Sequence, residues 1–369
     1  MFEKYKALEN KMLQIMDNDG NIINKEDFPQ IEPEKITEAY EKMLFERTAD
    51  TMTVGYQRQG RIFTYPPNYG QEAIHIAVAD TMDKEDWVVP AFRELGIYLA
   101  KGATLKEIFL YFMGYEEGTA FRNALKLLPI SVPIASQLPH ATGLGYAIKY
   151  KKLKEIVWAF VGDGGTSEGD FHEALNFAGV WQVPVIFIVQ NNQYAISTSV
   201  ENQTNSVNYA VKSLAYGIEG LKVDGNDYFA MYKALDFCSK YARENSKPVL
   251  IEALTYRKGA HTTSDDPKKY RTKEEEEKWE CTDPLKRLKA YLIKNNLFSE
   301  QQEEKLIEQY KNNIDKVFSE AENYEKYKLE DVFKHHYNEI PDDLKQQMNE
   351  YEIFLKWKQE NFKEVKTTH

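Results

Sequence analysis

Short apolar runs alternate with longer amphipathic stretches through most of the chain. Apolar runs that end in turn residues predict strands at 87–93, 155–162, 183–191, 220–223 and 248–255. Apolar residues at helical spacing predict helices over 34–58, 71–82, 104–113, 138–150, 167–181 and 228–245. Strands and helices that alternate in this way are typical of an α/β fold, so we expect a doubly wound parallel sheet flanked by helices.

The same pattern divides the chain into three segments. Residues 1–33 lack helical periodicity and carry turn residues at 17–20, which predicts an N-terminal arm. Residues 34–280 hold the alternating strands and helices and form the predicted α/β domain. Residues 281–369 are predicted to be a helical C-terminal segment, whose apolar stripe would pack on the main domain or on a partner chain.

Two stretches of the predicted domain lack clear periodicity. Residues 128–137 contain two prolines and several β-branched residues, and we interpret them as an irregular edge strand. Residues 256–270 are polar and predict a loop after the last strand.

Two polar side chains follow neighbouring strands of the predicted sheet. Asp163 comes at the end of one apolar run and Asn192 at the end of the next, 29 positions later, with one amphipathic stretch between them. Such a strand–helix–strand unit places both strand ends on the same edge of a parallel sheet. We therefore expect the carboxylate of Asp163 and the amide of Asn192 to lie close together.

The residues around this pair predict a magnesium ion that carries a diphosphate. Magnesium prefers oxygen ligands, and the carbonyl of Tyr194 could complete a set with Asp163 and Asn192. Gly164 and Gly165 let the backbone approach a phosphate closely, and the helix that follows presents its N-terminal N–H groups to the anion.

Other phosphate-binding patterns are absent from the sequence. No GxxxxGKS or GxxxxGKT motif occurs, and no GxGxxG opens a helix after a strand, which disfavours a P-loop nucleotidase and a nicotinamide dehydrogenase. A metal-dependent phosphate hydrolase built on Asp163 remains an alternative, although no second carboxylate cluster follows either strand. Turn chemistry alone would explain either short motif taken singly.

The composition further restricts the possible binding partners and the cellular environment of the protein. The net charge of −11 over 369 residues argues against nucleic acid, and the apolar runs are too short to span a membrane. The N-terminal residues carry acids early and show no secretory signal pattern. Cys238 and Cys281 lie far apart and outside any CxxC motif, so we expect a reducing, cytoplasmic environment.

The central unit resembles the thiamine diphosphate motif. GDGGTSEGDFHEALNFAGV and VQNNQYAIST are similar to the alpha subunits of the decarboxylating first component of 2-oxo acid dehydrogenase complexes. The resemblance covers almost the whole chain and extends to YQRQGRIFTYPPNYGQEA, PAFRE, VDGND and YRKGAHTTSDDPKKYRTKEE. Among the members, subunits that act on pyruvate look most similar, and those that act on branched-chain 2-oxo acids come second.

This resemblance implies an enzyme with thiamine diphosphate and Mg²⁺ as cofactors. It would decarboxylate a 2-oxo acid, pyruvate first of all, and pass the acyl group to a lipoyl arm on the acyltransferase second component. The resemblance also implies a separate beta subunit, which supplies the glutamate that activates the aminopyrimidine, in a heterotetramer of two alpha and two beta subunits. A non-catalytic paralogue that only binds the beta subunit is the alternative, but Asp163, Asn192, Arg93 and His261 are all present.

The resemblance assigns expected roles to individual residues. Asp163, Asn192 and the Tyr194 carbonyl would hold magnesium, whereas the diphosphate would be lined by Gly164, Gly165 and Arg93. Phe92 stands where the family usually has a tyrosine, which removes one hydroxyl contact. The cofactor ring would meet the backbone of Val132 and the side chain of Ile134, which props it into a bent form, and His261 would be the catalytic residue that faces the reacting carbon.

Several other polar residues receive secondary interpretations. Ser131, Ser136 and Gln137 resemble a monovalent-cation site of the branched-chain relatives. Thr262 and Ser264 lie in the loop that relatives in higher organisms regulate by phosphorylation, and here we expect only an ordered loop. We interpret three histidines as helix or packing residues without a catalytic role: His75, His140 and His172.

Overall fold

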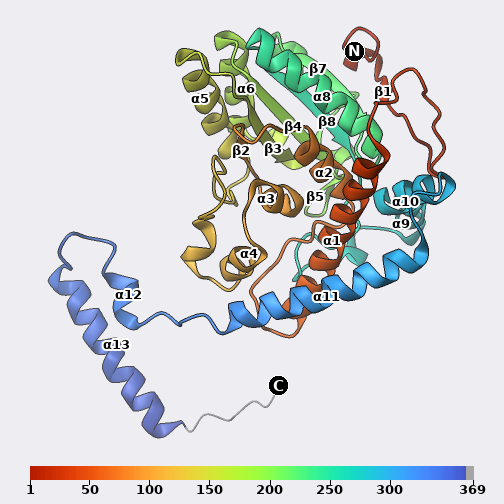
Figure 1. Cartoon of the computed structure of the whole chain (residues 1–369). Coiled ribbons are helices and arrows are strands. Elements are labelled where there is room, and N and C mark those ends of the chain that lie inside the picture. The colour runs from red at the N-terminus through yellow and green to blue at the C-terminus, as the bar shows by residue number, and fades with distance from the viewer. Residues whose placement is uncertain (363–369) are drawn as a thin grey trace. The chain divides into compact units, whose positions relative to one another are not determined.

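The computed structural model describes residues 1–362, which form two compact units (Figure 1). The larger unit is Met1–Ala321, and the smaller one begins at Glu322. The predicted C-terminal segment was expected to begin at 281, but α10 (Pro284–Lys294) and most of α11 (Glu300–Glu322) belong to the larger unit because their apolar stripes are buried in it. Its last residues, 363–369, lie outside the described part.

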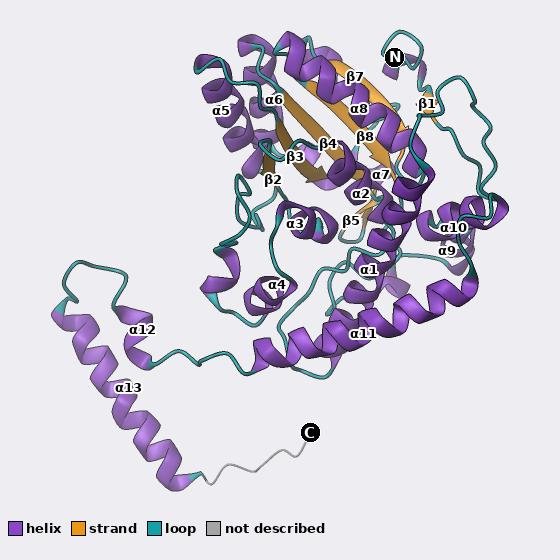
Figure 2. Ribbon diagram, in the orientation of Figure 1, coloured by secondary structure: helices purple, strands orange, loops and turns teal. Residues whose placement is uncertain are grey.

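The larger unit is built on one parallel sheet of six strands, which confirms the predicted α/β class (Figure 2). Its order is β1-β7-β8-β4-β3-β2, and every neighbouring pair is parallel. The strands of this sheet are β1 (Met12–Leu13), β2 (Trp87–Val89), β3 (Val157–Gly162), β4 (Val185–Asn191), β7 (Glu219–Asp224) and β8 (Val249–Leu254). A small hairpin outside it joins β5 (Tyr194–Ala195) to β6 (Thr198–Ser199).

Helices cover both faces of the sheet. Successive residues of a strand point to opposite faces, so Trp158 and Phe160 pack on one side while Val157 and Ala159 pack on the other. The first side is covered by α1 (Pro33–Arg58), α2 (Glu72–Thr81), α8 (Tyr228–Asn245) and α10, and the second by α5 (Gln137–Tyr150) and α6 (Gly169–Trp181). The remaining helices of this unit are α3 (Leu95–Lys101), α4 (Leu105–Phe112), α7 (Val200–Gln203) and α9 (Lys273–Glu280).

The N-terminal arm contributes a strand that the sequence pattern does not predict. Met12 and Leu13 pair with β7 and extend the sheet by one short strand. Just beyond this strand, Asp227 anchors the arm, since its Oδ2 accepts hydrogen bonds from the backbone N–H of Ile15 at 2.7 Å and of Met16 at 2.6 Å. The other carboxylate oxygen caps α8, so one buried side chain ties the arm to the domain.

Replacing Asp227 with alanine is expected to lower the free energy of unfolding by about 3 kcal/mol. The variant loses a helix cap and leaves two buried backbone N–H groups without an acceptor. Urea denaturation followed by circular dichroism would measure the change. Asp236→Ala on the same helix, where the carboxylate pairs with Lys240 at the surface, is the control and should shift stability by less than about 0.5 kcal/mol. Equal stability of the two variants would contradict this account.

The predicted edge strand at 128–137 is wrong. Residues 128–136 form a loop that follows an isolated bridge between Val88 and Leu127, and α5 begins at Gln137. Within the loop, the N–H of Leu128 donates to the carbonyl of Val88 at 3.0 Å and that of Ser131 to Ala91 at 2.8 Å. Pro129 and Pro133 lack backbone N–H groups, so the segment cannot donate a regular ladder of hydrogen bonds. The loop instead leads the chain across the carboxyl-terminal edge of the sheet.

The smaller unit contains α12 (Leu329–Phe333) and α13 (Asp342–Asn361). Tyr351, Phe354 and Trp357 follow one another at intervals of three along α13, and each is about half exposed. Within residues 1–362, no helix combines the length and the apolar character needed to cross a bilayer.

Candidate cofactor site

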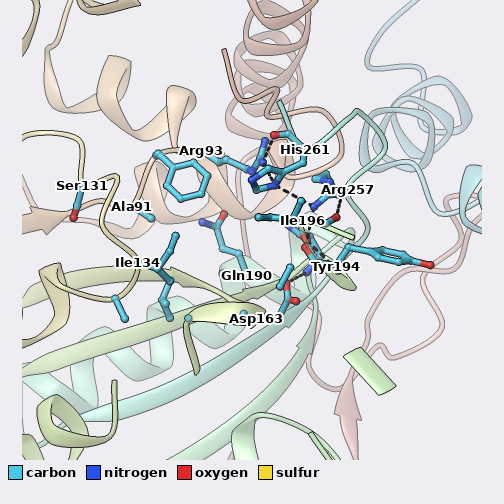
Figure 3. A pocket seen from close by; sticks show the side chains of 18 of the residues that line it. Ala91, Arg93, Ser131, Ile134, Asp163, Gln190, Tyr194, Ile196, Arg257 and His261 are labelled. Atoms are coloured by element: carbon cyan, nitrogen blue, oxygen red, sulfur yellow. Dashed lines mark hydrogen bonds between the residues drawn. The ribbon is translucent and has the colours of Figure 1, made fainter. Parts of the chain in front are cut away.

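A cavity lies at the carboxyl-terminal edge of the sheet, where β3 and β4 end. It encloses about 900 Å³, part of it open to solvent, and Figure 3 shows the side chains that line it. Nine of the ten predicted site residues line this cavity: Phe92, Arg93, Ile134, Asp163, Gly164, Gly165, Asn192, Tyr194 and His261. Val132 lines an adjoining cavity that shares Phe92, Ile134 and His261. The chain therefore brings all ten together.

Strand register places the polar ends of β3 and β4 side by side. Gly162 pairs with Gln190, so the residues that follow each strand emerge at the same edge. Asp163 opens a short 3₁₀ turn, Asp163–Ser167, and Asn192 leads into the hairpin that carries Tyr194. The topological argument from the sequence thus accounts for the meeting of these residues.

Three polar groups converge where a magnesium ion is expected. One terminal atom of the Asn192 side-chain amide lies 3.2 Å from Asp163 Oδ1 and 3.1 Å from the carbonyl oxygen of Tyr194. Without a cation the amide nitrogen takes this position and donates to both oxygens, whereas a bound cation would take the amide oxygen as a ligand. Among the described residues no cluster of three Asp, Glu, His or Cys side chains could bind a metal, so this set offers one carboxylate, one amide and one carbonyl. Such an oxygen set fits magnesium that also takes phosphate oxygens.

Hydrogen bonds on the side away from the cavity fix the carboxylate of Asp163. Its carboxylate is only 1% exposed, and Gln203 Nε2 donates to Oδ2 at 2.7 Å. Tyr209 in turn donates its hydroxyl to Gln203 Oε1 at 3.1 Å. Burial raises the pKa of the Asp163 carboxyl, whereas the hydrogen bond from Gln203 opposes the rise. A bound cation would favour the ionised carboxylate further.

The two glycines after Asp163 are required by packing. A Cβ atom at Gly164 would lie 2.5 Å from the Cβ of Ala195, and one at Gly165 would lie 2.4 Å from a methyl group of Val161. The turn after β3 and the β5–β6 hairpin are therefore in direct contact. This close approach leaves the backbone of the turn open toward the cavity.

Positive charge gathers on the opposite wall. Arg93 is 5% exposed and Arg257 is fully buried, and within residues 1–362 no carboxylate contacts either guanidinium. Arg93 donates to the carbonyl of Pro67 at 2.6 Å and to that of His261. Burial and the charge of Arg257 lower the pKa of Arg93 to about 9. An anion such as a diphosphate would relieve this repulsion.

His261 sits between the two arginines (Figure 3). Its Nδ1 atom lies 3.1 Å from Arg93 Nη2 and 3.4 Å from Arg257 Nη1, both of which can only donate. Burial and the charge of Arg93 lower the pKa of His261 to about 3, so the imidazole is neutral at pH 7. Nδ1 is thus an acceptor, and the proton remains on Nε2.

Apolar side chains form the rest of the cavity. The ring of Phe92 meets His261 edge to face, with 6.5 Å between centroids. Ile134 remains 46% exposed at the boundary of the two cavities, and Val132 is 59% exposed. These exposed apolar residues are consistent with a bulky ring entering from this side.

The sequence pattern missed four buried polar residues of the cavity wall. Arg257 donates to the carbonyls of Tyr194 and Ile196 and so holds the hairpin. Gln190 and Glu94 are buried neighbours of Asn192 and Arg93 in the chain, a proximity that could have indicated them.

The fourth is Gln71, which is 1% exposed and lies within the YGQEA segment already noted for its resemblance. Neither its amide oxygen nor its nitrogen has a hydrogen-bond partner among the described residues, which is costly for a buried amide unless a ligand supplies one.

The expected monovalent-cation site and the loop around Thr262 and Ser264 lie at the margin of the cavity. The hydroxyls of Ser131 and Ser136 are 3.2 Å apart, while Gln137 donates to the carbonyl of Phe160 at 2.6 Å. The predicted cation site there stays a prediction. Asp265 orders the loop around Thr262 and Ser264, since it accepts from the backbone N–H of His261 at 2.8 Å and from the hydroxyl of Tyr270.

Comparison with known proteins independently supports the family resemblance noted in the sequence. The family model described as "Dehydrogenase E1 component" matches residues 40–330. The chain is 42% identical to the pyruvate dehydrogenase E1 component subunit alpha of Acholeplasma laidlawii over 341 residues, 92% of this chain and 99% of that protein. It is 37% identical to the subunit of the same name from Staphylococcus aureus, over 93% of this chain and 92% of that protein. A third relative of that name, from Mycoplasma genitalium, is 36% identical over 91% and 94%.

The family match at residues 40–330 covers the sheet from β2 to β8, the cavity and the loop that carries His261. The resemblance noted in the sequence is thereby confirmed at the level of the family: this chain belongs to the dehydrogenase E1 component family.

Proposed function

We propose that this chain is the alpha subunit of a pyruvate dehydrogenase and binds thiamine diphosphate with Mg²⁺. The single observation that carries the proposal is the meeting of the Asp163 carboxylate, the Asn192 amide and the Tyr194 carbonyl opposite an arginine pair that, within residues 1–362, contacts no carboxylate. Such a cavity suits a cation and a diphosphate bound together. The names of the relatives support pyruvate as the substrate.

Each residue then has a physical task. Asp163, Asn192 and the Tyr194 carbonyl would hold Mg²⁺, while Arg93 would grip the diphosphate. Bound thiamine diphosphate supplies the nucleophilic carbon and the electron sink for decarboxylation. Ile134 would support the cofactor ring from below, beside the backbone of Val132. Neutral His261 would present Nε2–H toward the reacting centre and donate a hydrogen bond there.

A beta subunit would complete the site in a heterotetramer of two alpha and two beta subunits. Support comes from the apolar wall of the adjoining cavity, where Phe63 is 68% exposed and Val132 is 59% exposed. Burial of these side chains against a partner chain would stabilise the assembly. The glutamate that activates the aminopyrimidine would come from that partner, and the acetyl group would pass to lipoyl on the acyltransferase component. Cys238 and Cys281 are both free thiols, which fits the proposed cytoplasmic location.

Turnover of two substrates would test the proposal. The chain is co-expressed with its candidate beta subunit, and the purified complex is supplied with thiamine diphosphate and Mg²⁺. We expect kcat/KM for pyruvate to exceed that for 3-methyl-2-oxobutanoate by at least about 10-fold, because one or two extra methyl groups change binding by about 1–3 kcal/mol. Release of carbon dioxide measures both reactions. A preference for the branched acid would contradict the substrate, and a complex that does not bind the cofactor would contradict the proposal as a whole.

A further inference from the structure

A chain of four polar side chains lies buried beneath the cavity. Glu46 comes from α1, His75 from α2, Gln190 from β4 and Glu94 from the turn before α3, and none is more than 2% exposed. Gln190 and Glu94 also line the cavity, whereas Glu46 and His75 lie behind them. Buried polar groups of this kind are costly unless each finds a partner.

Continuous hydrogen bonds link these four residues. His75 Nδ1 lies 2.6 Å from Glu46 Oε1, and His75 Nε2 lies 3.0 Å from Gln190 Oε1. Gln190 Nε2 donates to Glu94 Oε1 at 2.6 Å. Glu94 Oε2 then accepts from the backbone N–H of Arg93 at 3.0 Å. The series therefore ends at the residue proposed to grip the diphosphate.

The direction of these hydrogen bonds depends on the protonation state of His75. The partners on both sides of the ring are oxygen atoms, so both ring nitrogens must donate, and only the imidazolium can do so. A neutral ring would leave one nitrogen facing an oxygen. The Gln190 amide would then turn and direct its own oxygen at the carboxylate of Glu94.

The surroundings of His75 favour the imidazolium. Burial alone would lower its pKa, but the charges of Glu46 and Glu94 override this effect and raise the pKa to about 9. Glu46 is itself held in place, because the backbone N–H of Gly96 donates to Oε1 at 3.0 Å. A Cβ at residue 96 would lie 2.3 Å from Oε2, so the glycine leaves the space that the carboxylate occupies beside the ring.

We propose that His75 is a positioning residue for cofactor binding: as an imidazolium paired with Glu46, it fixes the amide of Gln190 and the carboxylate of Glu94, and so holds the backbone of Arg93 where a diphosphate is received. This inference rests on the proposed function, because it assigns the cavity to a diphosphate cofactor. It adds a residue that the helix-packing interpretation of His75 had left without a role.

The affinity of the complex for thiamine diphosphate, measured against pH, is the first test. Alpha and beta subunits are purified together with Mg²⁺, and the Kd is obtained by calorimetry from pH 7.5 to 9.5, where the diphosphate is fully ionised. The imidazolium fraction of His75 falls about 4-fold over this range, so the cofactor should bind about 3-fold more weakly at pH 9.5 than at pH 7.5. A Kd that does not change with pH would overturn the proposal.

A double variant separates positioning from stability. His75→Gln alone leaves a buried carboxylate unpaired, so His75→Gln is combined with Glu46→Gln, which keeps the network neutral. At pH 7.5 the folded double variant should bind the cofactor about 10-fold more weakly than the unmodified complex, and its affinity should fall less toward pH 9.5. The part of the fall that persists belongs to Arg93, whose pKa is also about 9, whereas an equal fall in both complexes would overturn the role of His75.

His336→Gln, on an exposed histidine of the smaller unit, is the matched control and should bind as the unmodified complex does. If the unmodified complex binds no thiamine diphosphate, the proposed function fails. If it binds and the double variant binds equally well, only the positioning role of His75 fails.

Discussion

Replacing Asp163 with alanine is expected to abolish the magnesium-dependent binding of thiamine diphosphate while the fold remains intact. Asp163 provides the sole carboxylate of the converged oxygen set, so its loss removes the formal negative charge that would hold the cation. Changes to residues that merely orient a metal ligand commonly cost 10–100-fold in affinity, and we expect loss of the ligand itself to cost at least about 100-fold. Calorimetric titration of the cofactor at several Mg²⁺ concentrations would measure the change.

The fold should tolerate this substitution because the buried carboxylate contributes little to stability without a cation. Burial raises its pKa, which means that the ionised form is unfavourable in its present surroundings. Circular dichroism should therefore show an unchanged melting temperature to within a few degrees. Asp236→Ala serves again as the surface control. Tight binding by Asp163→Ala that still required Mg²⁺ would contradict the assignment of the metal ligand.

Replacing His261 with alanine is expected to slow turnover by about 100-fold or more and to leave cofactor affinity nearly unchanged. A positioned acid or base typically contributes 10²–10⁴-fold to a rate. Arg93 also donates to the carbonyls of Pro67 and His261, so removal of the imidazole leaves it anchored by backbone oxygens. Steady-state kinetics with pyruvate, together with calorimetry of cofactor binding, would separate the two effects.

The pH dependence of the turnover rate provides a further test of the role of His261. The pKa of His261 is lowered from its ordinary value of 6.5 to about 3, so the folded protein keeps the ring neutral throughout the range from pH 6 to 8. The rate of the unmodified complex should show no step from this residue in that range. His261→Asn retains a donor of similar reach and should recover part of the rate. Full activity of His261→Ala would remove the residue from the reaction.

Much of the site could be predicted because it depends on local order along the chain. The strand–helix–strand unit fixes the distance between the ends of β3 and β4, and the register of the two strands follows from their apolar runs. The positions of Asp163 and Asn192 therefore follow from topology alone. The two glycines at 164 and 165 also indicate a turn from the sequence alone. The structure explains them, because neither position has room for a Cβ atom.

Other features could not be predicted because they depend on contacts between distant segments. The strand Met12–Leu13 is too short to show periodicity, and it is held by Asp227, more than two hundred positions away. The helix α3 has only seven residues and no side-chain cap, so its sequence carries little signal. The network around His75 joins four separate elements, and no spacing in the sequence relates Glu46 to Gln190.

The contact between Gly164 and Ala195 has a consequence for how this site can change. Since the space between the two loops cannot take one more carbon atom, a larger residue at either position would push the carboxylate and the carbonyl of the ion site apart. The distance between the proposed ligands is therefore fixed by the packing of these two loops against each other. To change which ion the proposed site prefers, Asp163 or Asn192 should be substituted and Gly164 and Ala195 kept, because the donor atoms can then change while the two loops keep their packing.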